Sequence, residues 1–206
     1  MSGGSSAVEV TQGDFEQAAG VLGRAFLGTE QWIRMVPNDE KRPELLAGMF
    51  ERTLRMVAAA GGLSEHTNGF EGAALWFPPG IKPTMWSAFR AGYMSPRWLF
   101  AQPFGDTRRM MRVLSWFEGF HPKLVPDPHW YLMALGVDPE FHGRGFGSEL
   151  VRAGIERADR DRVAIYLETE TDENVGFYER LGFDVLETAV NPDIDLSFAF
   201  MARQPN

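Results

Sequence analysis

The sequence predicts an α/β fold, a single domain with a mixed, mostly antiparallel sheet flanked by helices. A glycine-rich stretch, His142-Gly143-Arg144-Gly145-Phe146-Gly147, joins a strand-like run at Trp130–Val137 to a helix-like run that begins near Ser148. A further apolar strand follows at Val163–Thr169, and this order of elements is a βαβ unit. A hairpin-like pair of strands precedes the unit and an antiparallel pair follows it.

The elements at the start of the chain follow from local patterns. Residues 1–6 are small and mostly polar, and are predicted to form a flexible tail ahead of a domain over residues 7–206. Ala7–Thr11 alternates apolar and polar residues as a strand does, and Asp14 suits the N-cap of a helix to about residue 27. A second helix is expected over Pro43–Ala60, where apolar residues recur at helical spacing.

The middle of the chain is predicted to contain a hairpin and, after it, an inserted helical segment. Leu63–Thr67 and Phe70–Phe77, separated by Asn68-Gly69, are predicted to form a hairpin, because Asn-Gly suits a type I′ turn. Residues 81–120 are rich in Trp, Phe, Met and Arg and are broken by Pro and Gly, which indicates an inserted segment of short helices laid across the sheet.

The end of the chain is predicted to complete the sheet. A helix over Ser148–Asp159 precedes the Val163–Thr169 strand, and Asn174–Leu181 forms another helix that Gly182 ends. Phe183–Glu187 and Leu196–Ala202 then form the final antiparallel pair.

Composition excludes several classes of protein. With 206 residues, of which 44% are hydrophobic, the chain can bury a substantial core as one domain. It has no cysteine, so disulfides, thiolate metal sites and a cysteine nucleophile are excluded. A net charge of −8 argues against a nucleic-acid partner. Without a secretory signal or a membrane-spanning stretch, a soluble, cytoplasmic protein with no membrane partner is expected, either a monomer or a homodimer.

The glycine-rich stretch is the main candidate for a binding site. Three glycines at alternate positions let the backbone turn several N–H groups toward one point, and the positive end of the following helix favours an anion such as a pyrophosphate. The alternative is a plain glycine-rich turn. A dinucleotide fingerprint does not fit, because Ser148 stands where its third Gly is needed and too few residues follow Glu168. A Walker loop does not fit either, since no Gly-Lys-Ser or Gly-Lys-Thr is present.

Two motifs carry a family resemblance. Leu135-Gly136-Val137-Asp138-Pro139-Glu140-Phe141-His142-Gly143-Arg144-Gly145-Phe146-Gly147 resembles the acetyl-CoA signature of the GNAT N-acetyltransferases. Asn174-Val175-Gly176-Phe177-Tyr178-Glu179-Arg180-Leu181-Gly182-Phe183 resembles the last helix and strand of that family. The order of elements also agrees, so the resemblance covers nearly the whole chain. It implies a GNAT-like sheet splayed between the Trp130–Val137 and Val163–Thr169 strands.

The resemblance implies acetyl-CoA as cosubstrate and no metal. Pantetheine would lie between the splayed strands against Leu135, Gly136 and Val137, with Gly136 permitting a bulge that starts the splay or simply a local kink. The predicted contacts of the pyrophosphate and nearby groups are His142, Gly143, Arg144, Gly145, Phe146, Gly147, Ser148 and Asn174. His142 replaces the usual Gln or Arg, and Thr171 stands where the family has Asn. Arg144 can equally be a solvated side chain, and Asn174 can equally be a helix N-cap.

Two residues are the catalytic candidates. Tyr178 occupies the family's acid position and is a protonated donor at neutral pH, whereas the alternative is a core tyrosine. Glu168, at the end of its strand, can accept the amine proton directly or through water, or can be only a polar strand end. An alkyl amine with a pKa near 10.4 is about 0.04% free base at pH 7, so it needs more help than an α-amino group. His121 and His129 rank below Glu168 as bases.

The acceptor is expected to be a primary amine of a small molecule, such as an antibiotic-like amine, attacked directly in a ternary complex. An aromatic wall ahead of the cofactor strand suits a compact amine, although such residues can equally belong to the core. The predicted substrate contacts are Trp76, Trp86, Tyr93, Phe117 and Trp130. The alternatives are acetylation of a peptide N-terminus or lysine, and a noncatalytic acyl-CoA-binding module.

Overall fold

The structure is a computed structural model that describes residues 7–95 and 104–206. The predicted tail at residues 1–6 and part of the segment at 81–120 lie outside the described residues. Seven described strands form one sheet in the order β1-β2-β3-β4-β5-β7-β6. The strands are β1 (Val8–Glu9), β2 (Leu63–His66), β3 (Gly72–Phe77), β4 (Trp130–Val137), β5 (Ile165–Thr169), β6 (Asp184–Asn191) and β7 (Leu196–Arg203).

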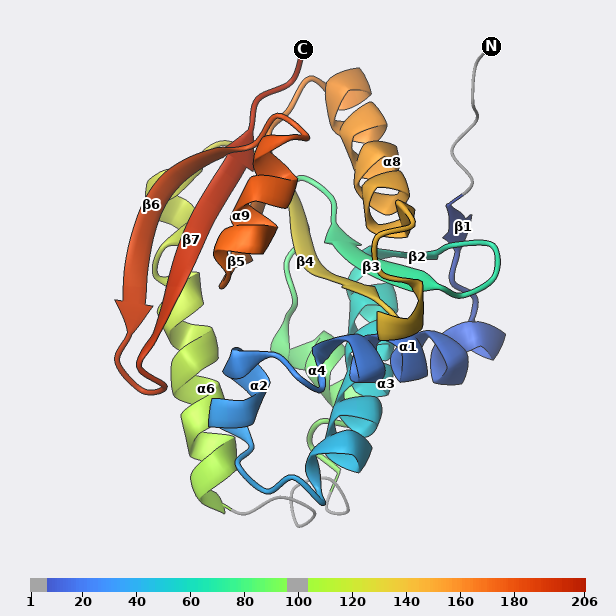
Figure 1. Ribbon diagram of the computed structural model, residues 1–206, viewed down its shortest axis with the longest axis vertical. Helices are drawn as coiled ribbons and strands as arrows, with labels where there is room; N and C mark the ends of the chain where they lie inside the picture. The colour runs from blue at the N-terminus through green and yellow to red at the C-terminus, as the bar shows by residue number, and fades with distance from the viewer. Residues whose placement is uncertain (1–6, 96–103) are drawn as a thin grey trace.

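Helices cover both faces of this sheet (Figure 1). The helices are α1 (Phe15–Phe26), α2 (Glu30–Met35), α3 (Arg42–Ala60), α4 (Met85–Arg90), α6 (Phe104–Glu118), α7 (His121–Leu124), α8 (Phe146–Asp161) and α9 (Asp172–Glu179), with short 3-10 turns η1 (Gln12–Asp14) and η2 (Pro139–Phe141). All described strand pairs are antiparallel except β4 with β5, which are parallel. The predicted single α/β domain with a mixed, mostly antiparallel sheet is therefore confirmed.

Successive side chains of a strand point to opposite faces of the sheet, so the core has two layers. Ala73, Leu75 and Phe77 of β3 pack with α1, α3 and Phe200 of β7 on one face. Ala74 and Trp76 pack with Leu150 and Val151 of α8 on the other face. We call these the α3 face and the α8 face.

The β2–β3 connection differs from the predicted two-residue turn. The strands end at His66 and resume at Gly72, so five residues form the loop. The Thr67 hydroxyl donates to Glu71 Oε2 at 2.6 Å and accepts from the Gly72 N–H at 3.0 Å. These side-chain bonds favour the longer loop, since the Asn68-Gly69 pair alone would have closed a tighter turn.

Two helix boundaries were also predicted imperfectly. α8 begins at Phe146, within the glycine-rich stretch, rather than near Ser148. α9 begins at Asp172, and its N-cap is Thr171, whose hydroxyl accepts from the Asn174 N–H at 3.1 Å. The N-cap alternative for Asn174 is therefore wrong, because Thr171 already satisfies that end of the helix.

Candidate active site

The sheet opens between β4 and β5. The two strands pair only at their first residues, Trp130 with Ile165 and Tyr131 with Tyr166. Beyond these pairs β4 bonds to β3 and β5 bonds to β7, so their facing edges have no strand partner within the described sheet. An extended ligand that carries amide groups can occupy such an opening as an additional strand.

Gly136 does not form the bulge that was predicted to start this opening. It pairs in register with Ala73, and the irregularity in β4 lies farther back, opposite Leu75 and Trp76. A Cβ at position 136 would come within 2.8 Å of Ala25 Cβ and 3.0 Å of Leu22 Cδ2. Glycine is therefore needed here because α1 crosses closely over the end of β4.

The loop after β4 has the backbone that the glycines predicted. Gly143 and Gly145 have φ of +74° and +90°, in the left-handed region that other residues adopt at a cost. Gly145 is the N-cap of α8, a helix of 16 residues. The N–H groups of its first turn have no acceptor within the helix, so Phe146, Gly147 and Ser148 present donors at its positive end. This arrangement fits a pyrophosphate.

Side chains on both sides hold this loop in place. The His142 ring nitrogen Nε2 lies 2.9 Å from the Val137 carbonyl oxygen, which ties the loop back to the end of β4. Asp138 accepts from Arg24 Nε of α1 at 2.6 Å and from the Glu140 N–H at 3.3 Å. Burial opposes ionisation of Asp138, but these donors and the Arg24 charge lower its pKa. The Arg144 guanidinium lies over the Phe141 ring, 5.3 Å from the ring centre.

A cavity of about 560 Å³ lies beside this loop, between α1 and the β2–β3 connection. Arg24 and Asp138 line it together with Phe70 and Phe141. None of the residues that line it belongs to β4 or β5.

Tyr178 belongs to the core on the α8 face of the sheet. It is 8% exposed, and its ring packs against Phe177 and Phe183 with centroid separations of 4.9 and 5.6 Å. Burial raises the pKa of the Tyr178 hydroxyl above its ordinary value. Tyr178 is therefore protonated at neutral pH and able to donate a proton.

Glu168 lies on the opposite face of β5. It alternates with Leu167, which packs on the α8 face, and shares the α3 face with Tyr166. Burial raises the pKa of Glu168 to about 7, while the nearby Tyr131 and Tyr166 hydroxyls oppose this rise. A carboxyl group with this pKa can exchange protons near neutral pH. Glu168 and Tyr178 thus belong to the two opposite faces of the sheet.

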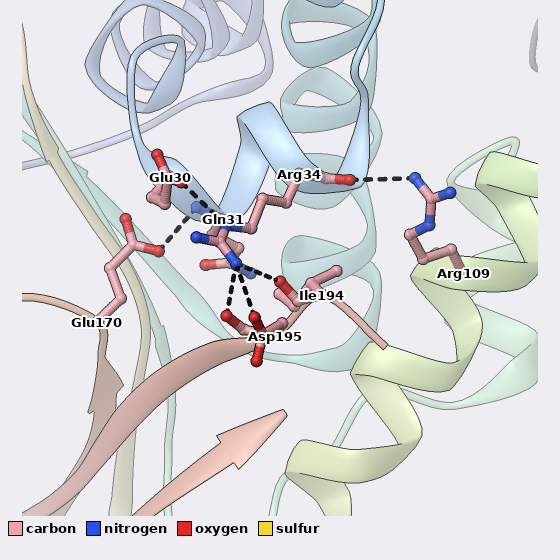
Figure 2. A network of polar contacts seen from close by, with 7 residues as sticks. All are labelled: Glu30, Gln31, Arg34, Arg109, Glu170, Ile194 and Asp195. Atoms are coloured by element: carbon pink, nitrogen blue, oxygen red, sulfur yellow. Dashed lines mark hydrogen bonds and ion pairs between the residues drawn. The ribbon is translucent and has the colours of Figure 1, made fainter. Parts of the chain in front are cut away.

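Helix α2 packs on the α3 face of the sheet, beside the end of β5 (Figure 2). The Gln31 N–H donates to Glu170 Oε2 at 3.0 Å, and Arg34 Nη1 donates to the carbonyls of Ile194 and Asp195 at 3.0 and 2.5 Å. Arg109 of α6 donates to the Arg34 carbonyl at 3.0 Å. These contacts fasten a six-residue helix to β5, to the β6–β7 turn and to α6.

The predicted substrate contacts do not share one environment. Trp76 is fully buried on the α8 face, and Trp130 lies on the same face with its Nε1 donating to Asp161 at 2.8 Å. Phe117 packs against Phe198 on the α3 face. The Tyr93 hydroxyl lies 2.6 Å from the Thr53 hydroxyl of α3, and Trp86 is 66% exposed and stacked on Phe89.

Sequence reasoning missed the surroundings of Glu168. Tyr131 and Tyr166 face the same side as Glu168, because they are paired across the two parallel strands and β5 alternates. The pairing register of β4 with β5 would have identified these three residues as neighbours. His121 also joins them, with ring centroids 4.5 Å from Tyr131 and 4.2 Å from Tyr166. His129 lies beside His121, 5.1 Å between centroids, and its Nδ1 is 2.7 Å from the Asp127 carbonyl.

The described residues contain no group of three or more His, Asp or Glu side chains placed to hold a metal ion. No helix in the described part of the chain is long and apolar enough to cross a membrane.

Comparisons with known proteins find similarity to acetyltransferases. The model of the acetyltransferase (GNAT) family matches residues 110–183. An uncharacterised N-acetyltransferase of Schizosaccharomyces pombe is 26% identical over 97% of this chain and 83% of its own length. A mycothiol acetyltransferase of Salinispora arenicola is 31% identical over 55% of the chain, an alignment that spans about half, 49%, of that protein.

A solved structure has a similar fold over nearly the whole chain. It is a Corynebacterium glutamicum protein described as histone acetyltransferase HPA2 and related acetyltransferase, 25% identical, with a TM-score of 0.66 over 97% of this chain and 96% of that one. Residues 110–183 are thus similar to the GNAT family, and the fold of the chain is similar to that of this acetyltransferase.

Proposed function

We propose that the chain is an acetyl-CoA-dependent N-acetyltransferase that transfers the acetyl group to a primary amine of a small molecule in a ternary complex. The observation that carries this proposal is the opening between β4 and β5, which the left-handed glycine loop and the start of α8 follow. The family's cosubstrate fits the chain, because unpaired strand edges suit pantetheine and the left-handed Gly143 and Gly145 lead into the donors of α8.

The proposed chemistry needs one proton acceptor and one proton donor. Acetyl-CoA, when bound, supplies the thioester carbonyl that the amine attacks, so that a C–N bond forms and the C–S bond breaks. Glu168 takes a proton from the acceptor nitrogen, directly or through water, and this frees the lone pair. Tyr178 donates its hydroxyl proton to the departing sulfur and recovers a proton from the acylated nitrogen, which loses its second N–H proton as the amide forms. A backbone N–H of residues 135–137 stabilises the carbonyl oxygen as negative charge develops on it.

The contacts of the cosubstrate are assigned as follows. Leu135, Gly136 and Val137 face the pantetheine amides along the open edge of β4. The loop and first turn of α8, residues 143–148, hold the pyrophosphate, while His142 positions the loop through Val137. Asn174 stands in the first turn of α9 with its side chain free of the capping role, and we assign it to the cosubstrate as well.

Within the family, three segments resemble puromycin N-acetyltransferase, which supports an antibiotic-like amine as acceptor. They are the β4 strand, Leu167-Glu168-Thr169 and Phe177-Tyr178-Glu179-Arg180-Leu181-Gly182-Phe183. The match to mycothiol acetyltransferases also supports a small-molecule acceptor.

The test is release of CoA, followed spectrophotometrically, against a panel that contains puromycin, simple alkyl amines, and peptides with a free N-terminus or an internal lysine. The proposal expects turnover with small amines and little with peptides. Turnover with peptides alone would instead favour a protein acetyltransferase. CoA binding without turnover of any acceptor would favour a noncatalytic acyl-CoA-binding module.

A further inference from the structure

The cavity between α1 and the β2–β3 connection has both charged and aromatic walls. Its volume of about 560 Å³ is typical of cavities that hold small molecules. Arg24, Asp138 and Glu140 contribute the charges, and Phe70 and Phe141 contribute the rings. We call it the α1 cavity.

The α1 cavity is separate from the place proposed for the cosubstrate. Its lining ends at Phe141, so the glycine loop and the first turn of α8, residues 142–148, take no part in it. The opening between β4 and β5 is also separate, since neither strand contributes a residue to the lining. A ligand in the α1 cavity would therefore contact groups to which the proposed acetyl transfer gives no role.

Arg24 offers hydrogen-bond donors at this cavity. Its Nε donates to Asp138 Oδ2 at 2.6 Å, and its side chain is 58% exposed. Over residues 7–95 and 104–206, its terminal nitrogens Nη1 and Nη2 have no hydrogen-bond or ion-pair partner. Because the Nε bond restrains the guanidinium plane, these nitrogens present a held fork, the shape that binds a carboxylate through two hydrogen bonds.

Two carboxylates line the same cavity. Asp138 is buried and Glu140 is exposed. Burial opposes ionisation of Asp138, but the bonds from Arg24 and the Glu140 N–H lower its pKa, so this carboxylate is charged at pH 7. A simple anion would meet both carboxylates, and a simple cation would leave the Arg24 donors unused. One guanidinium beside two carboxylates instead complements a ligand that carries a negative and a positive group.

The Phe70 ring is held in place from behind. It stacks on the buried His66 ring, with 3.7 Å between centroids and 8° between planes, and the Phe70 N–H donates to the Thr67 carbonyl at 2.8 Å. The φ of Phe70 is +58°, a left-handed backbone that a bulky residue rarely adopts. Phe141 lines the cavity from η2, and in the described part of the chain no ring contact joins it to Phe70. An aromatic ring of a ligand can therefore pack against both.

We propose that the α1 cavity binds an aromatic α-amino acid in its zwitterionic form. The carboxylate accepts from Arg24 Nη1 and Nη2, the ammonium group donates to Asp138 and Glu140, and the ring packs against Phe70 and Phe141. A peptide N-terminus lacks the adjacent carboxylate, and an arylalkyl amine has no carboxylate at all. Both should therefore bind this cavity more weakly.

Calorimetric titration of the protein without CoA tests the site, because this inference does not depend on acetyl transfer. The probes are L-phenylalanine and three analogues that each lack one group: L-alanine lacks the ring, 3-phenylpropanoate lacks the ammonium group, and L-phenylalaninamide lacks the carboxylate. We expect saturable heat with L-phenylalanine and association at least about tenfold weaker with each analogue. No heat with L-phenylalanine at millimolar concentration, or equal affinity for it and any analogue, would overturn the inference.

Arg24→Gln separates a ligand contact from a structural role. Affinity for L-phenylalanine should fall about tenfold or more, whereas affinity for L-phenylalaninamide, which has no carboxylate for Arg24, should stay within about twofold. Arg55→Gln is the control, since Arg55 is 50% exposed on α3 and pairs with Glu51 outside the cavity. An equal loss for both ligands would make the role of Arg24 structural, and unchanged affinity for L-phenylalanine would place its binding elsewhere. Either result would overturn the inference.

Phe70→Asn tests the ring contact, because asparagine adopts the left-handed backbone of this position more readily than most residues. L-phenylalanine should then bind no more tightly than L-alanine, whose own affinity should be unchanged. The melting temperature shows whether the variant is folded, and the Arg24→Gln comparison decides if it is not. A folded variant that still prefers L-phenylalanine over L-alanine as strongly as the parent would contradict the proposal.

Discussion

The Trp76 ring of β3 lies directly against Gly154 of α8, so closely that a Cβ at position 154 would fall 2.2 Å from the ring. Trp76 is fully buried, and the backbone of α8 meets it without an intervening side chain. This contact sets the distance between α8 and the sheet, and therefore the position of the glycine loop at the start of α8.

Gly154→Ala should consequently destabilise the protein. Neither the ring nor the helix can move without disturbing the core, and overpacking of this kind costs about 1–3 kcal/mol. Urea unfolding measures the loss. Gly20→Ala is the matched control in α1, where the added Cβ meets only the flexible end of Arg24 at 3.3 Å. The control should gain about 0.5–1 kcal/mol from helix propensity, and a loss of similar size in both variants would contradict the packing argument.

Gly145→Ala should weaken CoA binding. The φ of +90° at Gly145 is strained for alanine by about 1–3 kcal/mol, so the loop must shift or store that energy. Calorimetry should then show CoA affinity lowered by tenfold or more. Gly28→Ala serves as comparison, because Gly28 has ordinary φ and open space around its Cβ position. Unchanged affinity in Gly145→Ala would show that the loop backbone does not hold the cosubstrate.

Tyr178→Phe should lower kcat by at least about a hundredfold, as expected for loss of a general acid. The ring packing against Phe177 and Phe183 is kept, so CoA affinity and melting temperature should change little. Steady-state kinetics with a saturating amine gives the answer. A variant that turns over as fast as the parent would remove Tyr178 from the mechanism.

Glu168→Gln should change how stability depends on pH. The pKa of Glu168 is about 7 in the folded protein, above the ordinary 4.5, so the folded state binds the proton more tightly. Stability from this group is complete below pH 4.5 and is lost as pH rises through about 7. The parent should therefore match Glu168→Gln at pH 4.5 and fall below it by at most about 3 kcal/mol at pH 8.

Urea unfolding at the two pH values tests this difference. Glu51→Gln, on α3 and away from Glu168, is the carboxylate control. The ionisation of Glu168 should also appear in the kinetics. In the pH profile of the parent, kcat/KM should rise with pH along a limb centred near pH 7. That limb should be absent from the residual activity of Glu168→Gln. A limb that persists unchanged would assign it to another group.

Arg34→Ala should loosen α2. Loss of the bonds to Ile194 and Asp195 leaves this short helix held mainly through Glu170 and Arg109. Hydrogen exchange over residues 30–35 should accelerate by about tenfold or more, since a hydrogen bond to a charged group contributes about 1.5–3 kcal/mol. Arg55→Ala, which breaks the exposed pair with Glu51 and the contact of Arg55 with the Phe15 ring, should leave α2 unchanged. Equal exchange in both variants would show that Arg34 does not anchor the helix.

Much of the fold could be predicted because local signals agreed with it. Periodicity placed α1, α3 and α8, and the glycines at 143 and 145 marked a backbone that other residues rarely adopt. Helix α2 could not be predicted, because its six residues are stabilised by contacts from Glu170 and Ile194, far along the chain. The pattern around Gly136 also suggested a bulge, whereas packing of α1 is the reason for that glycine.

The site was predicted only in part for a similar reason. The motif resemblance proposed Tyr178, and the end of its strand proposed Glu168, but neither signal gives the face of the sheet that each residue occupies. Strand register places Tyr131 and Tyr166 beside Glu168, and register depends on pairing between distant segments. Trp76 shows a second reason. An aromatic residue that lines a pocket has the same sequence pattern as one that packs in the core, so the sequence does not separate the two.

Calorimetric titration of the parent protein with CoA tests the central claim most directly, that the opening between β4 and β5 and the start of α8 hold this cosubstrate. We predict saturable heat of association, weakened in Gly145→Ala and preserved in Tyr178→Phe. No heat of association at millimolar CoA would contradict the account.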